Sequence, residues 1–315
     1  MSYKNTWLRH IAQISLLAII FQVCSPIISI SHAVNVQYYV DATNWNDANP
    51  GTSSGAPWQT LSRVNAEVLQ PDDHVSFLCG ESWTWEVLDI QESGNVGVPI
   101  VFNSYSSGSC STKPILWWVT TGNMSDAEID GLSLIATGSS TVTIGPASVN
   151  ISLKNSDITH VSGNGCIEAI NSTGLSMSGN TFVWCSYAFS GSEVEWVISH
   201  NTFSGMTDDA VQIVSTQAVT INNNIFSNLE RWAVVFGVIT SVTQNVISNV
   251  CQWSGTGCAA IRNELYSPLG TSYNADISQN IIQNVGNGIS MNNYGISIAN
   301  IDGSNILQNT VNNAE

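Results

Sequence analysis

Ionisable residues are rare in this chain, and several of them fall close together in its second half. Charged residues make up 10% of the sequence, yet Asp208 and Asp209 are followed 22 residues later by Glu230 and Arg231. Paired carboxylates can act as general acid and base, or as acid and nucleophile, when a glycosidic bond is cleaved. An arginine beside them can orient a substrate carboxylate or hydroxyl, or stabilise developing charge. We therefore take Asp208, Asp209, Glu230 and Arg231 as candidate catalytic residues.

A second set of side chains could bind the ligand on which these groups act. Glu168, Gln212 and Arg262 take the same position in their respective repeats, which predicts that they stack on one outward face. Exposed indole rings are suited to stacking on a sugar ring. The candidate substrate-binding residues are therefore Glu168, Gln212, Trp232, Trp253 and Arg262.

Each of these interpretations has a simpler alternative. Asp208 and Asp209 could end a turn and pair with Arg231 across the surface, as an exposed ion pair that contributes about 0–1 kcal/mol. The tryptophans could pack at a rim of the fold. Trp196 falls in phase with core positions, and Lys154 suits a solvated position on a strand, so neither is assigned to the site.

The candidate residues lie on a repeat whose period indicates the fold class. Six asparagines occur in one recurring phrase, with an apolar residue three before and another two after each, at steps of 21, 23, 21, 35 and 29 residues. Helical repeats need about 33 to 47 residues, so a basic step near 21 favours a leucine-rich repeat or a parallel β-helix, and the leucine-rich signature is absent. We predict one β-helical coil per repeat and an inward ladder of asparagine side chains. The ladder residues are Asn180, Asn201, Asn224, Asn245, Asn280 and Asn309.

Further patterns extend the repeat. Segments 129–134 and 153–158 keep the apolar spacing without the asparagine, so the solenoid starts by residue 129. Longer repeats at 250–258 and 264–274 flank the coil of Arg262, where inserted loops would wall a groove. Each coil also carries a second short strand that begins with a small residue and a branched or aromatic one. These pairs are Cys166-Ile167, Ala188-Phe189, Ala210-Val211, Ala233-Val234, Ala260-Ile261 and Gly288-Ile289.

The first 33 residues have the features of an export signal. Lys4 and Arg9 precede the apolar run 11–21, and a Ser-His-Ala sequence at 31–33 supplies the small residues of a cleavage site. The alternative is a membrane anchor, but the run is well short of the roughly 18 residues that span a bilayer. Cleavage would remove two of seven basic residues, which leaves five cations against 23 acidic residues and a net charge of −18. We therefore predict a secreted protein, or one at the bacterial cell surface, with no nucleic-acid partner and no membrane partner after cleavage.

Six of the seven cysteines would remain after cleavage, an even number that permits three disulfides in an oxidising compartment. Cys251 and Cys258 flank one of the insertions, where a bridge would close an overhanging loop. The other expected pairs are Cys79 with Cys110 and Cys166 with Cys185. No Cys-His spacing indicates a zinc site.

The N-terminal segment carries a family resemblance. The sequence YYVDATNWNDANPGTSSGAPWQTLSRVNA at 38–66, with LQPDDHVSFLCGESWT and GNVGVPIVFNSY after it, resembles the opening of secreted bacterial proteins of the pectin-lyase-like superfamily. The resemblance implies an all-β fold, a right-handed parallel β-helix (solenoid) with an N-terminal capping helix. It divides the chain into a signal peptide (1–33), a cap with the first coils (34–128) and the β-helix repeats (129–315).

The ends of the solenoid are expected to differ. Trp58, Leu61, Val64 and Val68 recur at three- and four-residue steps, an apolar stripe typical of a helix that covers the first coil. Uncapped solenoid ends aggregate, so such a lid is required. No comparable segment follows Asn309, and we expect an uncapped C-terminal end at which further sequence is missing.

A polar loop near the N-terminus is a candidate cation site. Asp41, Asp47 and Asn49 lie within nine residues together with further Asn and Thr side chains, an oxygen density suited to calcium. The pattern departs from an EF-hand. The alternative is that these residues simply form turns before Pro50-Gly51. Calcium is thus the one cofactor that the sequence indicates.

The resemblance narrows the activity only in part. Polygalacturonase-type members of the superfamily carry Asn-x-Asp, Asp-Asp, Gly-His-Gly and Arg-x-Lys, and this chain matches only the Asp-Asp, at 208–209. Lyase members use a Lys or Arg base, for which the coils offer Lys154, Arg231 and Arg262. We expect a polysaccharide lyase or glycoside hydrolase that acts on an extracellular polysaccharide. A non-catalytic, glycan-binding or adhesive β-helix is the alternative, and the oligomeric state is left open.

Overall fold

Parallel strands dominate the molecule. The computed structural model describes residues 35–314, apart from 45, 163, 193–194, 215–217, 238–239, 253–256, 264–274, 287–292 and 299–303. The described strands form an 11-stranded sheet and a 17-stranded sheet, and the pairings between neighbouring coils are parallel. An all-β parallel fold was the prediction from the repeat, and it is confirmed.

The strands fall into three series. The 11-stranded sheet contains β1 (Gln37–Val40), β2 (His74–Leu78), β4 (Ile100–Tyr105), β6 (Ser125–Asp130), β9 (Val149–Lys154), β12 (Leu175–Ser178), β15 (Trp196–Ser199), β18 (Val219–Asn222), β21 (Thr240–Thr243), β24 (Ala275–Ser278) and β27 (Asn305–Leu307). A second series contains β7 (Ser133–Ala136), β10 (Asp157–His160), β13 (Thr181–Val183), β16 (Thr202–Ser204), β19 (Ile225–Ser227), β22 (Val246–Val250), β25 (Ile281–Val285) and β28 (Thr310–Ala314). A third contains β8 (Val142–Ile144), β11 (Ile167–Ile170), β14 (Phe189–Ser192), β17 (Val211–Val214), β20 (Val234–Phe236), β23 (Ala259–Asn263) and β26 (Tyr294–Ser297). The long strands β3 (Ser82–Ile90) and β5 (Ile115–Thr121) precede the second and third series, and β5 pairs with a member of each.

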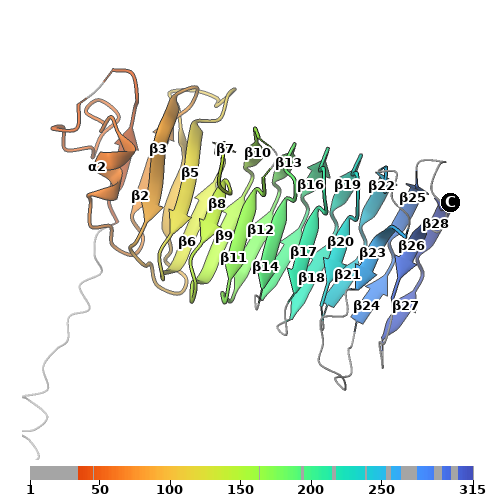
Figure 1. Cartoon of the computed structure of the whole chain (residues 1–315). Helices are drawn as coiled ribbons and strands as arrows, with labels where there is room; N and C mark the ends of the chain where they lie inside the picture. The colour runs from red at the N-terminus through yellow and green to blue at the C-terminus, as the bar shows by residue number, and fades with distance from the viewer. Residues whose placement is uncertain are drawn as a thin grey trace, which may run out of the picture. The chain divides into compact units, whose positions relative to one another are not determined.

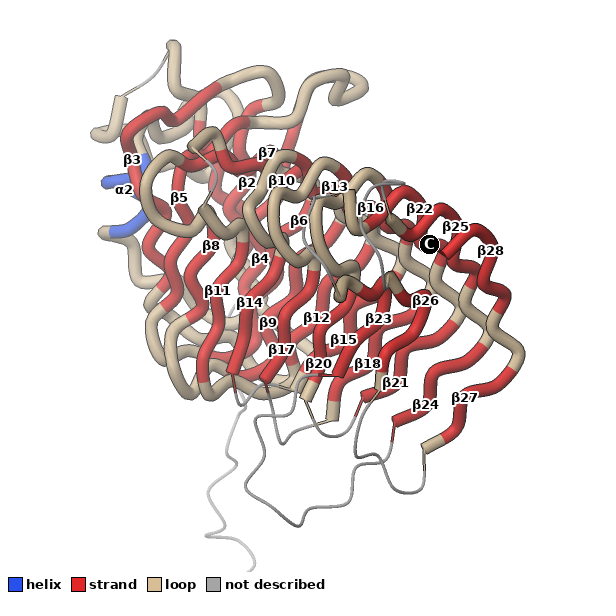
Figure 2. Tube along the Cα trace, turned by 45° about the vertical axis from the view of Figure 1, so that its right-hand side comes forward, coloured by secondary structure: helices blue, strands red, loops and turns tan. Residues whose placement is uncertain are grey.

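From β6 to β26 each coil contributes one strand to each series, and the coils follow one another along the stack. Figure 1 shows this succession, and Figure 2 labels β12, β15, β18 and β21, which are neighbours in one sheet. The pattern of burial explains it: in β12, for example, Leu175 and Met177 are buried and alternate with half-buried serines. A strand with one apolar face must cover that face, and here the three series cover one another around a common core.

The asparagine ladder is confirmed. In each coil the side-chain Oδ1 accepts hydrogen bonds from the backbone N–H and the Nδ2 of the asparagine one coil earlier, at 2.9–3.1 Å. Asn224 Nδ2 also donates to the carbonyl of Ile198 at 2.9 Å, and the other members make equivalent bonds. The ladder side chains are buried except for the last, Asn309, which is half-buried.

The ladder extends one coil further than the sequence pattern indicated. Ser156 occupies the ladder position in the coil before Asn180: its backbone N–H donates to Asn180 Oδ1 at 2.9 Å, and its hydroxyl accepts from the N–H of Leu132 at 3.2 Å. Serine can do this because its hydroxyl, like the amide, both donates and accepts. The sequence pattern missed it because only asparagines were counted.

The core repeats in the same way. The rings of Phe182, Phe203 and Phe226 stack on β13, β16 and β19, with centroids 4.9 and 4.7 Å apart. Trp196 is buried, and its ring lies 4.2 Å from that of Phe189, which confirms its interpretation as a packing residue. Stacked aromatic rings of neighbouring coils exclude water along the axis of the solenoid.

The predicted second strands are in register through most of the third series. Ile167, Phe189, Val211, Val234 and Ile261 are successive partners. The last predicted pair is wrong, because the partner of Ile261 is Ile296 in β26. Gly288-Ile289 lies outside the described residues. The sequence offered two Gly-Ile pairs in this coil, and the extended preceding repeat made the choice of register ambiguous.

A short helix, α2 (Leu61–Asn65), lies between β1 and β2 in the chain and packs against β3. The Thr60 side chain accepts from the N–H of Arg63 and so caps the helix. Leu61 and Val64 are buried, as the apolar stripe predicted, but Val68 is 70% exposed, so the prediction is wrong there. The helix ends before a further turn could carry Val68 to the core.

All three predicted cysteine pairs form disulfides. The Cα–Cα distances are 5.6 Å for Cys79–Cys110, 5.6 Å for Cys166–Cys185 and 5.8 Å for Cys251–Cys258. None of the helices in the described part of the chain is long and apolar enough to cross a membrane.

Candidate functional site

The outer face of the third series brings the predicted binding residues into one column. Glu168, Ser190, Gln212, Val235 and Arg262 are successive register partners on β11, β14, β17, β20 and β23. Figure 2 shows these strands following one another across the same sheet. The prediction that Glu168, Gln212 and Arg262 stack on one face is therefore confirmed in register.

One member of the column departs from expectation. Val235 has the outward register but is fully buried. Its partner Arg262 reaches back to the coil of Val235, where its guanidinium carbon lies 4.3 Å from the centroid of the Trp232 ring. The Arg262 side chain therefore lies over the Trp232 ring of the coil of Val235. The outward column of polar side chains is interrupted at this coil, between Gln212 and Arg262.

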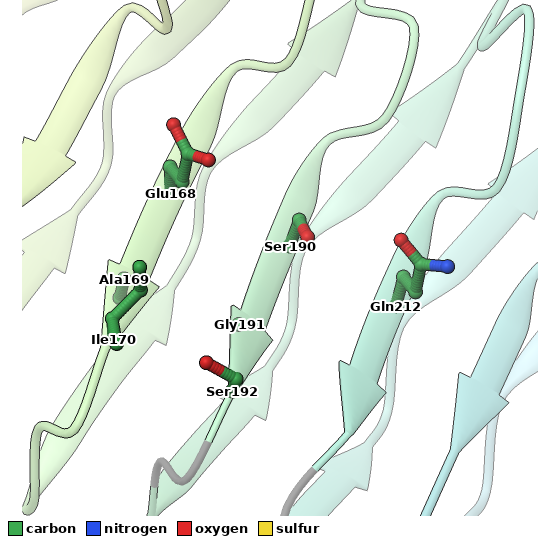
Figure 3. Close-up of a pocket in the computed structure, with 7 residues that line it drawn as sticks. All are labelled: Glu168, Ala169, Ile170, Ser190, Gly191, Ser192 and Gln212. Atoms are coloured by element: carbon green, nitrogen blue, oxygen red, sulfur yellow. The ribbon is translucent and has the colours of Figure 1, made fainter. Parts of the chain in front are cut away.

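A pocket opens on the part of the column that stays uncovered. Its volume is about 240 Å³, and its lining residues are Glu168, Ala169, Ile170, Ser190, Gly191, Ser192 and Gln212. The middle strand, β14, contributes only serine and glycine, whereas the flanking strands contribute longer side chains, so the hollow lies along β14. Figure 3 shows Glu168 and Gln212 on either side of Ser190. A carboxylate, an amide and hydroxyl groups thus face one surface recess.

A polar network lies against this pocket. The Ser140 hydroxyl donates to Glu168 Oε2 at 3.1 Å. The ring of Tyr187 covers Gly165 so closely that an added Cβ would lie 2.0 Å from a ring carbon. Burial raises the pKa of the Tyr187 phenol, the charges of Glu168 and Asp208 raise it further, and a hydrogen bond with Ser140 opposes the rise. Tyr187 is therefore a neutral hydrogen-bonding group at physiological pH.

The candidate catalytic residues gather one coil further along. Arg231 Nη1 forms an ion pair with Asp208 Oδ1, and its Nε lies 3.9 Å from Asp209 Oδ1. Asp209 is only 3% exposed and also accepts from the backbone N–H of Trp232 at 3.4 Å. Glu230 is exposed on the same coil as Arg231. One arginine therefore bridges the two aspartates, one of them buried and the other half-exposed.

The predicted aromatic wall has a different environment from the one expected. Trp232 is 8% exposed, and the guanidinium carbons of Arg231 and Arg262 each lie 4.3 Å from its ring centroid. A sugar could stack on this ring only by displacing an arginine from it. Trp253, the other predicted aromatic contact, lies outside the described residues.

The pocket and the aspartate pair belong to one continuous surface. Tyr187 precedes β14 by two residues, and Asp209 and Trp232 take the same position before β17 and β20. The charges of Glu168 and Asp208 both raise the pKa of the Tyr187 phenol, and register places Tyr187 one coil before Asp209. Sequence reasoning did not select Tyr187, although its place in the column of Asp209 and Trp232 was a usable signal.

Two other polar side chains have structural surroundings. Lys154 pairs with Glu128 at 2.5 Å on the 11-stranded sheet, in keeping with a surface charge on a strand. His160 is buried: its Nδ1 accepts from the N–H groups of Ser162 and Asn164, and its Nε2 is 2.8 Å from the carbonyl of Ser139. These bonds hold a turn.

The candidate calcium loop uses its carboxylates for hydrogen bonds to its own backbone. Asp47 Oδ1 accepts from the N–H groups of Gln59 and Thr60 at 2.8 and 3.0 Å, and Oδ2 accepts from the Thr60 hydroxyl at 2.8 Å. Asp41 Oδ1 accepts from Thr43 and Asn44 in the same way, and Asn49 Nδ2 donates to a carbonyl. In the described ranges no group of three or more His, Cys, Asp or Glu residues is placed to hold a metal ion. Calcium stays a prediction.

Comparison with known proteins supports the fold. No family model matches the chain. Over 88% of this chain, the structure resembles pectate lyase Pel9A (80% of that chain, 13% identity, TM-score 0.56) and a rhamnogalacturonan lyase (87% of that chain, 13% identity, TM-score 0.51). A stretch of 82 residues is 37% identical to a lacto-N-biosidase of Bifidobacterium longum subsp. longum, and this stretch is 25% of the present chain and 5% of that protein. The chain thus has the parallel β-sheet fold of these two solved lyases.

Proposed function

We propose that this chain is a secreted carbohydrate-active protein, which binds an extracellular polysaccharide across β11, β14 and β17 and cleaves it beside Asp208 and Asp209. The observation that carries the proposal is the pocket along β14, which is lined by Glu168, Gln212 and hydroxyl groups; Gln212 follows Asp209 by three residues on the same coil. Its volume of about 240 Å³ is below the range of roughly 300–1,000 Å³ usual for enclosed small-molecule sites. An open recess of this size suits one residue of a chain that continues along the surface.

The charge of the protein favours an uncharged glycan. The formal net charge is −16, and the pocket itself carries the Glu168 carboxylate. A polyuronate would be repelled by this field, whereas the hydroxyl groups of a neutral sugar can donate to the carboxylate and accept from the amide of Gln212.

Each residue near the aspartate pair has a role in this proposal. Asp208 and Asp209 supply two carboxylates in different environments, one half-exposed and one buried, which is the arrangement that separates an acid from a base. Arg231 holds both in place and can release Asp208 toward a substrate. Glu230 is an exposed third carboxylate within the same turn. Tyr187 would donate its phenolic hydrogen to the bound sugar between the pocket and the pair.

The similar proteins support this class of activity. The lacto-N-biosidase, the pectate lyase and the rhamnogalacturonan lyase all act on carbohydrates by name. The pectin-lyase-like fold is one that places long parallel ladders beside an extended chain, which suits a polymeric ligand.

The test is a glycan panel. Reducing-sugar release and absorbance of unsaturated uronate products should be measured for the wild type, Asp209→Asn and Asp276→Asn. Asp276 is an exposed aspartate on β24 and serves as the matched control. We expect cleavage of a neutral polysaccharide, a loss of at least about 100-fold in Asp209→Asn, since single catalytic groups contribute factors of about 10²–10⁴, and no change in Asp276→Asn. Full activity of Asp209→Asn would exclude the proposed catalytic pair.

Pocket occupancy can be tested separately. Ser190→Leu places a larger side chain in the hollow on a half-buried strand position and should abolish glycan binding while the midpoint of thermal unfolding stays unchanged. Binding that survives this change would move the ligand site away from β14.

A non-catalytic glycan-binding protein is the second candidate. The observation in its favour is that Arg231 neutralises Asp208 and lies near Asp209, so the carboxylates have a structural use already. In that case the wild type binds a glycan of the panel, releases no product, and Asp209→Asn binds as tightly as the wild type.

We further propose that the protein is exported, that α2 caps the solenoid and that the loop of Asp41 and Asp47 binds calcium. Three disulfides support an oxidising extracellular location, the sequence features of residues 1–33 support a cleaved signal, and the buried Leu61 and Val64 support α2 as a lid on a right-handed coil. A chelator such as EGTA should lower the unfolding temperature if the loop of Asp41 and Asp47 binds calcium. An unchanged unfolding temperature would mean that the hydrogen bonds described above hold the loop without a metal.

A further inference from the structure

Three tryptophans gather on β3 and β5, away from the pocket and the aspartate pair. The ring of Trp85 lies 4.3 Å from that of Trp117 and 6.3 Å from that of Trp118, and the last two rings are 5.7 Å apart in an edge-to-face contact. Trp85 is 72% exposed. We call Trp85, Trp117 and Trp118 the tryptophan cluster. Isolated exposed apolar residues are ordinary, but a group of indole rings on a protein surface indicates a binding site.

The backbone displays Trp85 at a cost to stability. Its φ is +67°, in the left-handed region that a bulky side chain rarely adopts. The pairing of β3 with β5 shifts register between Trp83 and Val87, so Trp85 lies in a bulge. Bulges re-aim side chains and often accompany functional sites, and such backbone strain costs about 1–3 kcal/mol. Trp83, two residues earlier, is by contrast buried in the core.

The cluster also contains a polar group that packing leaves unsatisfied. The Nε1 of Trp118 is buried and has no hydrogen-bond partner in the described structure. A buried donor of this kind costs about 1–3 kcal/mol. Strain at Trp85 and an unpaired donor at Trp118 together show that the cluster is not arranged for stability.

Strand register connects the cluster to the pocket. Trp118 precedes Thr120 by two residues and so faces the same side of β5. Thr120 is the register partner of Thr143 on β8, and Thr143 is the partner of Glu168 on β11. Two strand spacings of about 4.8 Å and two residues along the strand place Trp118 roughly 10–12 Å from Glu168. The outer surface between them contains threonine hydroxyls and lacks charged side chains in this column.

The size and surroundings of the cluster favour a sugar chain over a protein partner. A stable protein interface buries about 800 Å² on each side, whereas the exposed apolar side chains of β3 and β5 are Trp85 and Val87, with Trp117 and Trp118 half-buried. Hydrogen-bonding groups border the rings: Asp89 Oδ1 accepts from the Thr120 hydroxyl at 2.9 Å and from Gln91 Nε2 at 2.6 Å. Flat rings with a polar border match the apolar face and hydroxyl edge of a pyranose.

We propose that Trp85 and Trp117 form a remote subsite, at which the same uncharged polysaccharide chain that occupies the pocket along β14 stacks a sugar residue. Trp117 on β5 lies three coils nearer the N-terminus than β14, and Trp85 on β3 lies four coils nearer. The inference rests on the proposed function for the identity of the ligand. It adds that the ligand is a chain long enough to span from the tryptophan cluster to Glu168, and that chain length determines affinity.

Binding should be measured by affinity gel electrophoresis and calorimetry, with β-glucan, xylan, galactan and mannan as probes, and with short and long oligosaccharides of whichever polymer the wild type binds. Trp85→Ala and Trp117→Ala should each weaken binding of the long chain about tenfold, because loss of one aromatic contact corresponds to roughly one tenfold step in Kd. Affinity for the short oligosaccharide should not change. Trp85→Phe, which keeps a ring, should retain most of the affinity, and Val68→Ala, an exposed apolar control near α2, should have none of these effects.

The outcomes separate the two proposals. If Ser190→Leu removes binding of both ligands while Trp85→Ala and Trp117→Ala bind the long chain like the wild type, the subsite is wrong and the pocket stands. If the tryptophan variants weaken short and long ligands equally, the cluster is not a remote subsite. If the wild type binds none of the four polymers, the proposed function fails first, and the subsite fails with it.

Discussion

Two turns flank the strands β13, β16 and β19, and they have opposite characters. The turn before these strands carries Asn180, Asn201 and Asn224 in equivalent hydrogen-bonded positions. The turn after them carries Tyr187 in one coil, Asp208 and Asp209 in the next, and then Glu230, Arg231 and Trp232. The first turn repeats one residue for stability. The second varies its residues over the same spacing and carries four charged residues on two neighbouring coils.

The difference shows how a solenoid separates stability from activity. Every coil needs the same solution for its buried turn, because each must pair with both neighbours along the axis. An outward turn has no such requirement and can carry whatever chemistry a ligand needs. Changes in the ladder should therefore act first on unfolding, and changes in the outward turn first on binding and turnover.

The largest effect on stability is expected for Asn224→Ala. The change removes the acceptor of Asn201 N–H and Nδ2 and the donor to the Ile198 carbonyl, all in a buried position. Two or three unsatisfied groups should lower the free energy of unfolding by about 3–5 kcal/mol. Denaturant titration followed by circular dichroism measures this. Asn222→Ala, at a half-buried position of the same coil, should stay within about 0.5 kcal/mol, and equal losses in the two variants would contradict a special role for the ladder.

The next largest loss of stability is expected when the disulfide between Cys166 and Cys185 is removed; both residues are fully buried. Loop-closure entropy for a separation of 19 residues predicts a loss of about 3 kcal/mol in the double alanine variant, against about 2.5 kcal/mol for Cys251 and Cys258, separated by 7. Thermal unfolding of the two variants under the same non-reducing conditions gives the comparison. A larger loss for Cys251 and Cys258 would show that the inserted loop matters more than the span of chain that is closed.

A substitution in the outward turn should affect glycan cleavage more than stability. Arg231→Gln removes the cation beside Asp208 and the buried Asp209, and we expect a loss of only about 1–2 kcal/mol, because the arginine is 35% exposed and its pairing is screened by water. Glycan cleavage should nevertheless fall by at least about 100-fold, as for the aspartate it positions. The free energy of unfolding and the rate of glycan cleavage should be measured on the same preparation. A loss of stability comparable with that of Asn224→Ala, together with a normal cleavage rate, would contradict the expected difference between the two turns.

The smallest effect is expected at Asp47, and it depends on pH. Burial alone would raise the pKa of this carboxyl, but hydrogen bonds from the Thr60 hydroxyl and from the backbone of Gln59 and Thr60 outweigh it, and the pKa is lowered. The ionised form therefore contributes stability above the usual aspartate pKa of about 3.9, and this contribution is lost as pH falls through the lowered value. Asp47→Asn should be less stable than the wild type by about 1 kcal/mol at pH 7 and equal to it near pH 2. A constant difference across that range would mean that the charge of Asp47 is not involved.

The interior of the fold could be predicted from the sequence, and much of the outer surface could not. A ladder position is visible because the same amide recurs at the same spacing from apolar residues, and the inference fails only where serine does the same work, at Ser156. The register of Glu168, Gln212 and Arg262 followed from the repeat for the same reason.

The surroundings of an outward-facing residue depend on the conformations of long side chains. These conformations do not follow from the sequence repeat. Val235 is buried despite its outward register, and the Trp232 ring is covered by two arginines, one of which leans back from the next coil. The pocket also escaped prediction, because it arises from what β14 lacks: serine and glycine between two strands with longer side chains.

The hydrogen bonds between the ladder asparagines all run in one sense. Each asparagine accepts through Oδ1 from the coil before it and donates through Nδ2 toward the coil after it. The bonds between asparagines thus give the column a direction, and each Nδ2 also donates to a backbone carbonyl of the coil before it. In Asn224→Asp the carboxylate would still accept from Asn201, but it would face Asn245 Oδ1 and the Ile198 carbonyl with an oxygen in place of the amide donor. The damage would therefore differ on the two sides: the coil ahead would lose the donor to Asn245 Oδ1, and the coil behind would keep its bonds from Asn201 but lose the donor to the Ile198 carbonyl.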